Sequence, residues 1–296
     1  MKIAILLPVF NKLNYTISCL SSLHEEITKN NLTDYFELVL VDDGSTDGTG
    51  AYVKQHFPFV IVVAGDGNLW WSGGINKGAA YAISNLKVDY VLLWNNDIAT
   101  HDNYFVTLLK LIQNEDKNTI IGSKIYMNYE NRTIWSMGGF INPYIGKIGM
   151  IGYNEPDSQN YQKSLEVDWI PGMGTLVPVE IINKIGFWDD VNFPQYHGDS
   201  EFTYRAKING YKLVVSPELV LSNDVSNTAI SHEGNFKKLL KLFKDRRSLY
   251  NYRVNTAFIK KYGKGPLKYA HLLNSYTILI LSFLKRKFVS VFKGKR

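Results

Sequence analysis

Two carboxylates about a hundred residues apart are the side chains of this sequence best suited to chemistry. Asp97 ends the apolar run VLLWNND, and Asp199 lies within PQYHGDSEF. A carboxylate at the end of a buried strand can bind a hard cation, because Mg²⁺ and Mn²⁺ prefer oxygen ligands. A carboxylate within hydrogen-bond reach of a hydroxyl can instead accept its proton as that hydroxyl attacks. Chemistry at a phosphate-linked substrate would need both groups.

Each motif also has a structural explanation. Taken alone, NND after a strand is more often a turn, and GDSEFTYRAKINGY is typical of an amphipathic helix whose N-terminal acids are favoured by the helix dipole. The chemical interpretation therefore depends on the elements that hold the two acids and on the motifs beside them.

Apolar runs of strand length alternate with segments of helical period in the first part of the chain. Near-continuous runs of Val, Ile and Leu closed by polar residues predict buried strands at 2–10, 36–43, 60–65 and 90–97. Helical spacing predicts helices at 15–28, 46–56, 72–86 and 103–113, the second capped by Thr46. This alternation predicts a parallel sheet with right-handed crossovers, whose ligands bind beyond the carboxyl ends of the strands.

The predicted strands end in polar motifs. In PVFNK, Phe10 could stack on a nucleobase or pack in the core. In VDDGSTDGT, Asp43 could accept hydrogen bonds from a base or a ribose, whereas Asp47 suits a capped turn. In GDGNLWWSGGINKG, close glycines let the backbone approach a ligand ahead of a helix. That segment lacks the spacing of the NTPase phosphate loop and of the dinucleotide fingerprint, so neither ATP hydrolysis nor NAD chemistry is supported.

Together, PVFN, DDGSTDGT, NLWWSGGINKG and NND resemble the motifs of family 2 glycosyltransferases of the GT-A fold, over about residues 1–255. The bacterial rhamnosyltransferase-like branch is especially similar, with P-x-[YF]-N, D-D-G-S-x-D-G-T, N-x-G-x-[GA]-x-N-x-G and N-x-D. Trp70 and Ile75 depart from the third motif. The resemblance implies a Rossmann-like mixed, mainly parallel α/β sheet flanked by helices, and inverting transfer of a sugar from a nucleotide diphosphate to a hydroxyl.

The resemblance also implies roles for individual residues. Asp97 would be the main ligand of Mn²⁺ or Mg²⁺, and Asp199 the catalytic base, although Gly198 stands where the family usually has an acid. Trp169, Gly172 and Glu201 would lie near the acceptor. The implied donor-binding residues are Pro8, Phe10, Asp43, Asn68, Gly74, Asn76 and Asn96.

Two further positions have more than one interpretation. The family often has a histidine after a P-E-x-x-V strand. In this sequence Asn223 stands near that position, and His232 follows nine residues later. His232 is therefore the candidate for a second metal ligand or a phosphate partner. Trp71 and Trp169 lie inside motif loops and are the tryptophans best suited to sugar contact, although tryptophan is usually part of the core.

Charge is distributed unevenly along the 296 residues. Residues 237–296 carry 17 of the 33 Lys and Arg side chains and one of the 27 acids, Asp245. Such a segment attracts nucleic acid or an anionic membrane, and its interleaved Leu, Ile and Phe favour the membrane. The apolar run from Tyr276 to Leu284 is too short to span a bilayer, so we expect monotopic association. The alternative is a C-terminal helix packed on the body, with solvated lysines.

These patterns predict a GT-A domain at 1–236, with a nucleotide-binding part at about 1–122 and an acceptor part at about 123–236, and a basic helical segment at 237–296 that associates with membrane. The single cysteine, Cys19, excludes an intramolecular disulfide and favours a reducing compartment. The N-terminus is predicted to be a first strand instead of a signal peptide. No pattern indicates an oligomeric state.

The expected protein is a metal-dependent, inverting glycosyltransferase that uses dTDP-rhamnose or a UDP-hexose. Its acceptor would be a hydroxyl of a glycan or lipid-linked glycan in bacterial cell-surface polysaccharide synthesis, at the cytoplasmic face of the membrane. A nucleotidyltransferase would share the sheet and the acidic metal site, yet PVFNKLN lacks the basic Gly-rich loop that would bind a triphosphate. A non-catalytic glycan-binding or scaffold protein is the other alternative, and would not require these acids.

Overall fold

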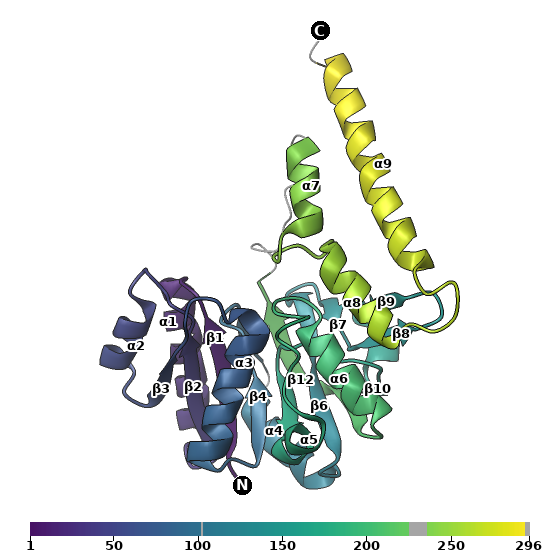
Figure 1. Cartoon of the computed structure of the whole chain (residues 1–296). Coiled ribbons are helices and arrows are strands. Elements are labelled where there is room, and N and C mark those ends of the chain that lie inside the picture. The colour runs from purple at the N-terminus through teal and green to yellow at the C-terminus, as the bar shows by residue number, and fades with distance from the viewer. Residues whose placement is uncertain (102, 225–235, 294–296) are drawn as a thin grey trace. The chain divides into compact units, whose positions relative to one another are not determined.

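The computed structural model describes residues 1–101, 103–224 and 236–293, with side chains up to 286 (Figure 1). Contacts divide the chain into two compact units: Met1–Phe140 with Met150–Val225, and Ile141–Gly149 with Ser226–Arg296. The division into functional domains at residue 236 stays a prediction.

The strands are β1 (Ile3–Val9), β2 (Phe36–Asp42), β3 (Val60–Ala64), β4 (Tyr90–Leu93), β5 (Ile98–Thr100), β6 (Thr119–Asn128), β7 (Thr133–Ser136), β8 (Gly139–Asn142), β9 (Lys147–Met150), β10 (Leu165–Glu166), β11 (Thr175–Pro178) and β12 (Lys212–Asn223). The α-helices are α1 (Leu13–Lys29), α2 (Thr49–His56), α3 (Trp70–Tyr81), α4 (Tyr104–Asn114), α5 (Val179–Ile185), α6 (Gly198–Ile208), α7 (Phe236–Lys244), α8 (Tyr252–Tyr262) and α9 (Ala270–Lys293). A π-helical turn, Ala82–Leu86, extends α3, and a 3₁₀ turn spans Gln159–Tyr161.

One mixed sheet organises the first unit, in the order β10-β12-β6-β11-β4-β1-β2-β3. The pairs β1–β2, β1–β4, β2–β3 and β6–β12 are parallel, whereas β11 runs antiparallel to both β4 and β6. The strands β1, β2, β4, β6 and β12 therefore all end at the same edge of the sheet, and β11 begins there. The expected mixed, mainly parallel sheet flanked by helices is confirmed.

Alternating side chains of the central strands pack on opposite faces of the sheet, because the side-chain period of a strand is two. Ile3 and Ile5 of β1 belong to the apolar cluster formed with α1, α2 and α4. Ala4 and Leu6 belong to the cluster formed with α3, α5 and α6. The two helical layers are visible on either side of the sheet in Figure 1. Burial on both faces explains why these strands are near-continuous apolar runs.

The four N-terminal strands and the helices between them form where the sequence predicts, but the start of α2 was predicted wrongly. Gly48, with φ 86°, precedes α2, and Thr46 lies in the loop before it. The backbone N–H of Thr46 donates to Asn11 Oδ1 at 2.8 Å, while Asp47 Oδ1 accepts from Thr49 N at 3.1 Å. The bond to Asn11 of a neighbouring loop, which local patterns do not encode, holds Thr46 outside the helix, and α2 begins three residues later at Thr49.

The second unit contains α7, α8, α9 and Ile141–Gly149, which comprises the end of β8, most of β9 and the turn between them. Within it, Lys264 N donates to Pro143 O at 2.9 Å and His271 N donates to Ile145 O at 3.0 Å. Leu239 of α7 is buried together with Leu279 and Phe283 of α9. None of the helices among the described residues combines the length and the apolar content needed to cross a bilayer.

Candidate functional site

Asp97 and Asp224 follow two strands that end at the same edge of the sheet. Asp97 comes after β4, and Asp224 comes directly after β12. The backbone N–H of Asp224 donates to Asp97 O at 2.9 Å, and Tyr15 Oη donates to Asp224 Oδ2 at 3.0 Å. The strand β5 pairs antiparallel with the end of β12, with Ile98 opposite Asn223, and this fixes the loop that carries Asp97.

One oxygen of the Asp97 carboxylate is buried without a hydrogen bond from the described residues. This oxygen is Oδ1. Burial raises the pKa of Asp97, a hydrogen bond from its own backbone N–H lowers it, the nearby charge of Asp224 raises it and the charge of Lys12 lowers it; the net pKa is raised. A buried carboxylate oxygen without a donor, close to a second carboxylate, is a site that favours a cation.

The fit of this pair to a divalent metal depends on what a substrate would add. Within the described ranges, no group of three or more His, Cys, Asp or Glu side chains could hold a metal ion. Mg²⁺ is commonly held by one or two carboxylates together with substrate phosphates and water. Asp97 and Asp224 match that donor set, so their oxygen chemistry fits a metal that binds together with a diphosphate.

Asp199 lies in the first turn of α6 and is held by backbone N–H groups. Its Oδ2 accepts from Gly172 N at 3.0 Å, and its Oδ1 accepts from Ser200 N at 2.7 Å. Burial raises the pKa of Asp199, and these two hydrogen bonds and His197 partly oppose that rise. The carboxylate is therefore oriented and more basic than an exposed aspartate, as a general base requires.

Gly198, the residue before this aspartate, is explained by close packing. A Cβ at this position would lie 2.1 Å from Ser72 Oγ of α3 and 3.1 Å from Phe193 O. Ser72 Oγ donates to Phe193 O at 2.6 Å, so neither group can move away easily. The acid that the family usually has at position 198 would not fit this arrangement.

Trp71 contacts both the loop that carries Asp97 and Gly172, whose N–H bonds Asp199. Its Nε1 donates to Asn95 Oδ1 at 3.1 Å. Its ring lies against Gly172, where a Cβ would come within 2.2 Å of a ring carbon. Since the N–H of Gly172 donates to Asp199, a chain of contacts joins the two acids. A glycine is required at 172 because any side chain would displace the indole.

The proposed nucleotide residue Asp43 holds a loop in place. Its Oδ1 accepts from Gly67 N at 2.9 Å, and its Oδ2 accepts from Leu69 N at 2.9 Å and Trp70 N at 3.1 Å. Trp70 has a positive φ of 59°, and these N–H bonds stabilise that conformation. Asp43 therefore shapes the Gly67–Trp70 loop, and a contact with the donor would be an additional role.

Phe10 and Asn68 are exposed at the ends of their strand and loop, where a ligand could reach them; Phe10 is 47% exposed. The helix α3 approaches β1 closely, because a Cβ on Gly74 would lie 2.7 Å from Pro8 Cβ. Pro8 and Gly74 thus act in packing α3 against the strand end.

Asn76 and Asn96, the other two proposed donor residues, are bound to the protein itself. Asn76 Nδ2 donates to Trp188 O at 2.9 Å, and its Oδ1 accepts from Trp188 N at the same distance. Asn96 Nδ2 donates to Thr16 Oγ1 at 3.1 Å. The amide oxygen and the amide nitrogen of Asn76, and the amide nitrogen of Asn96, are therefore hydrogen-bonded within the protein.

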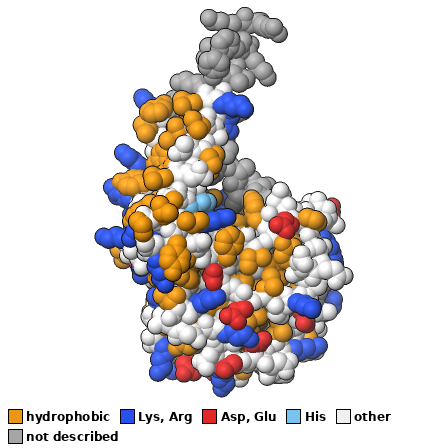
Figure 2. Space-filling view, turned by 90° about the vertical axis from the view of Figure 1, so that its right-hand side faces the viewer, with side chains coloured by type: hydrophobic (Ala, Val, Ile, Leu, Met, Phe, Trp, Pro, Cys, Tyr) orange, Lys and Arg blue, Asp and Glu red, His pale blue; other side chains and the backbone are white. Residues whose placement is uncertain are grey.

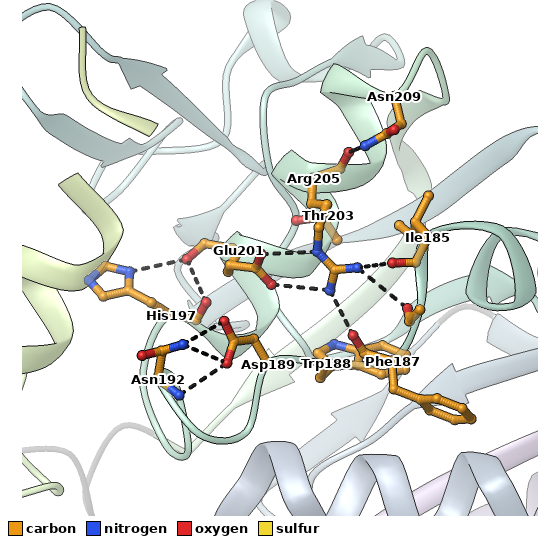
Figure 3. Close-up of polar contacts among 12 residues, drawn as sticks. Ile185, Phe187, Trp188, Asp189, Asn192, His197, Glu201, Thr203, Arg205 and Asn209 are labelled. Carbon is orange, nitrogen blue, oxygen red and sulfur yellow. Dashed lines mark hydrogen bonds and ion pairs between the residues drawn. The ribbon is translucent and has the colours of Figure 1, made fainter. Parts of the chain in front are cut away.

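Two of the proposed acceptor residues are interior residues. Trp169 is buried, and its backbone pairs with Gly139. Glu201 is fully buried and forms a bidentate ion pair with Arg205, at 3.0 Å to Nε and 3.2 Å to Nη2 (Figure 3). The guanidinium of Arg205 also donates to the carbonyl oxygen of Phe187 at 2.7 Å. Glu201 thus orients Arg205, which bonds α6, the helix that carries Asp199, to the loop after α5.

Two positions concern the second metal ligand. His232 lies outside the residues that the structure describes. Asp224 was missed by the sequence interpretation, which considered Asn223 and His232. Its signal was available: an acid directly after the apolar strand segment ELVLSN at the edge of the sheet where Asp97 lies. Asn223 itself is buried and pairs with β5.

Comparison with known proteins identifies the class to which this fold and site correspond. Residues 4–170 match the model of glycosyl transferase family 2, so the chain belongs to this family. It is 26% identical over 132 residues to glycosyltransferase GlyG of Streptococcus pneumoniae, covering 43% of this chain and 40% of that protein. It is 30% identical over 129 residues to GlyA of the same species, covering 43% and 17%. The chain thus spans less than half the length of these relatives.

Solved structures support the GT-A fold. The mannosyltransferase PcManGT from Pyrobaculum calidifontis, in complex with GDP-Man and Mn²⁺, superposes with a TM-score of 0.59 at 15% identity, over 95% of this chain and 70% of the other. S. aureus TarS 1-349 in complex with UDP gives a TM-score of 0.53 at 18% identity, over 75% and 60%. At these identities the likeness is one of fold.

Proposed function

We propose that this chain transfers a sugar from a nucleotide diphosphate sugar to an acceptor hydroxyl. The proposal rests on a chain of contacts from Asn95 through Trp71 and Gly172 to Asp199. This chain connects Asp199, the proposed general base, to the loop that carries Asp97, the carboxylate suited to a cation. Family membership and the GT-A fold support the same reaction class.

The donor diphosphate would bind beside the carboxyl ends of β4 and β12, where Asp97 and Asp224 would hold Mn²⁺ or Mg²⁺. Such a metal, when bound with the donor, stabilises the negative charge that builds up on the departing diphosphate. The exposed ring of Phe10 and the loop shaped by Asp43 are the surfaces that we assign to the nucleoside.

Asp199 would accept the proton of the acceptor hydroxyl as that oxygen attacks the anomeric carbon. The bond from this carbon to the diphosphate oxygen breaks with its electron pair on the diphosphate, while the new glycosidic bond forms and the proton moves to Asp199. One carboxylate acting as base, with in-line attack, gives inversion without a covalent sugar intermediate, as in inverting glycoside hydrolysis.

The finer proposals follow from the motifs and the charge distribution. We propose dTDP-rhamnose or a UDP-hexose as donor, and a glycan or lipid-linked glycan of a bacterial surface polysaccharide as acceptor. We also propose a peripheral location on the inner face of the cell membrane, mediated by the basic C-terminal segment.

Incubation with labelled nucleotide sugars and Mn²⁺ tests the reaction class. We expect sugar transfer, or slow donor hydrolysis when no acceptor is present. Release of pyrophosphate from a nucleoside triphosphate and a sugar phosphate would instead indicate a nucleotidyltransferase. No turnover of any donor, together with glycan binding, would indicate a non-catalytic protein. A thermal-shift screen of UDP, dTDP, GDP and CMP sugars would select the donors to label, because a ligand of the native state raises its melting temperature.

A further inference from the structure

Exposed apolar side chains are concentrated in the C-terminal helices. Of the 20 large apolar side chains that are exposed among the described residues, ten lie between Phe236 and Leu284, a stretch of about a sixth of the chain. On the face shown in Figure 2, apolar side chains gather on the upper part of the surface, with Lys and Arg side chains beside them. Scattered single apolar residues need no explanation, but such a gathering does.

The helix α9 has two apolar faces, and the unit itself covers one of them. Leu279 and Phe283 are buried with Leu239 of α7. A second set, which we call the apolar row, is 39% to 65% exposed. Its spacing of seven, eight and eleven residues places it on one face of the helix. The apolar row consists of Leu273, Ile280, Leu281 and Leu284.

The helix α7 repeats this arrangement on a smaller scale. Leu239 faces α9, while Phe236 and Leu240, four residues apart, are exposed at 56% and 47%. Four lysines lie along the nine residues of this helix, all of them exposed. They are Lys237, Lys238, Lys241 and Lys244.

We propose that α7 and α9 form a docking surface for an anionic lipid bilayer, with the apolar row inserted among the acyl chains near the headgroups and the lysines on the phosphates. This inference rests on the membrane location proposed above and assigns it to particular side chains. Charge complementarity identifies the occupant: residues 237–296 carry 17 basic side chains and one acid. A second copy of the same surface would bring like charges together, which an anionic bilayer does not.

The two kinds of side chain contribute differently to binding. A lysine near an anionic surface strengthens binding by about fivefold, and this contribution falls as salt screens it. An apolar side chain that leaves water strengthens binding by about tenfold, independently of lipid charge. Docking should therefore require both, and only the lysine contribution should disappear at high salt.

Flotation of the full-length chain with vesicles tests this surface. The wild type is expected to float with vesicles of phosphatidylcholine mixed with phosphatidylglycerol, and much less with phosphatidylcholine alone. The triple substitution Leu273→Gln, Ile280→Gln and Leu284→Gln keeps good helix formers and should weaken binding by at least about a hundredfold. Ile278→Gln is the matched control, because Ile278 is 55% exposed on α9 but lies off the apolar row, and it should have little effect.

Substitution of Lys237, Lys241 and Lys244 by Gln should weaken binding by about a hundredfold at low salt and reduce its salt dependence, because 14 of the 17 basic side chains of residues 237–296 remain. Circular dichroism would confirm that the variants are folded, and Mn²⁺-dependent donor hydrolysis in solution would report on the reaction separately. Equal binding of the wild type and the apolar-row variant, or no flotation with anionic vesicles, would overturn the docking proposal while leaving the reaction intact. A dimer that the apolar-row variant dissociates, without lipid binding, would also overturn it in favour of an interface between copies.

Discussion

The regions around Asp97 and Asp199 each contain a carboxylate, but they surround it with different hydrogen-bond donors and charges. Both carboxylates have a pKa raised by burial. Among the residues that the structure describes, no group donates to Oδ1 of Asp97, and a second acid, Asp224, is nearby, whereas both oxygens of Asp199 accept backbone N–H groups. A carboxylate that the protein leaves uncompensated is suited to an incoming cation, and one that it orients is suited to receive a proton in a fixed direction.

The comparison also separates these two acids from others in the same motifs. Asp43 and Glu201 are more buried than Asp97 and Asp199, and the hydrogen bonds that they accept hold the Gly67–Trp70 loop and Arg205 in place. Their substitution should therefore affect stability, whereas substitution of Asp97 or Asp199 should affect the reaction. The following variants test that division, in order of expected effect.

Asp199→Asn should lower kcat by about a thousandfold, because an amide cannot accept the proton of the acceptor. Donor binding, measured by calorimetry with Mn²⁺, should persist. If turnover were retained, Asp199 would not be the base. Ser200→Ala provides a control, because Ser200 bonds Asp199 through its backbone N–H, which alanine keeps.

Asp97→Ala should abolish metal-dependent donor binding, and Asp224→Asn should weaken it by about 10 to 100 fold. The measurement is donor affinity as a function of Mn²⁺ concentration. Glu218→Gln, an exposed acid on the same strand as Asp224, should leave that titration unchanged. An unaltered titration in both site variants would remove this pair from metal binding.

Glu201→Gln should destabilise the fold by about 3 kcal/mol, because it breaks a buried ion pair and leaves Arg205 undercompensated. A fall in melting temperature of at least about 5 °C is expected. The kcat of the remaining folded enzyme should change far less than in Asp199→Asn. Glu180→Gln, which removes an exposed acid from α5, is the control for loss of one negative charge. A large loss of kcat with unchanged stability would assign Glu201 to the reaction instead.

Gly172→Ala should lower stability by about 1 to 3 kcal/mol, because the new Cβ would collide with the Trp71 ring. It should also lower kcat by about tenfold, because the shift of residue 172 would weaken the bond from its N–H to Asp199. The double variant with Trp71→Phe should recover part of the stability, since the smaller ring makes room. A double-mutant cycle on melting temperature measures this coupling. Additive effects would show that the indole and Gly172 act independently.

The pH dependence should show the smallest effect. Because burial raises the pKa of Asp199, protonation inactivates the base at a pH above that of an exposed aspartate. The acid limb of kcat/KM, measured at saturating metal, should therefore fall above pH 3.8. It should move further upward in Gly172→Ala, because the N–H bond from Gly172 lowers the pKa of Asp199. An identical acid limb in the two proteins would contradict this link.

The sequence predicted the elements that depend on local and periodic patterns. The strands β1 to β4 are near-continuous apolar runs because the sheet is covered on both faces, and that pattern is visible without coordinates. The order of strand-end motifs identified the family, and the alternation of elements predicted the class of sheet. These properties depend on residue type and spacing alone.

Side-chain partners could not be predicted in this way. Asn76 and Glu201 fit a binding motif by type, but contacts with Trp188 and Arg205 engage them within the fold. The start of α2 was wrong for the same reason, because Asn11 of a neighbouring loop bonds Thr46. The sequence shows Asp224 as an acid directly after a strand, but its position beside Asp97 depends on how β5 pairs with β12.

The sequence by itself therefore determined the fold class, the family and which acids end strands or begin helices. Only the tertiary structure decided which of those acids are engaged by protein donors and which oxygen has none. The reason is physical: apolar periodicity is a local property of the chain, whereas hydrogen bonding and desolvation of a carboxylate depend on groups that folding brings from distant positions.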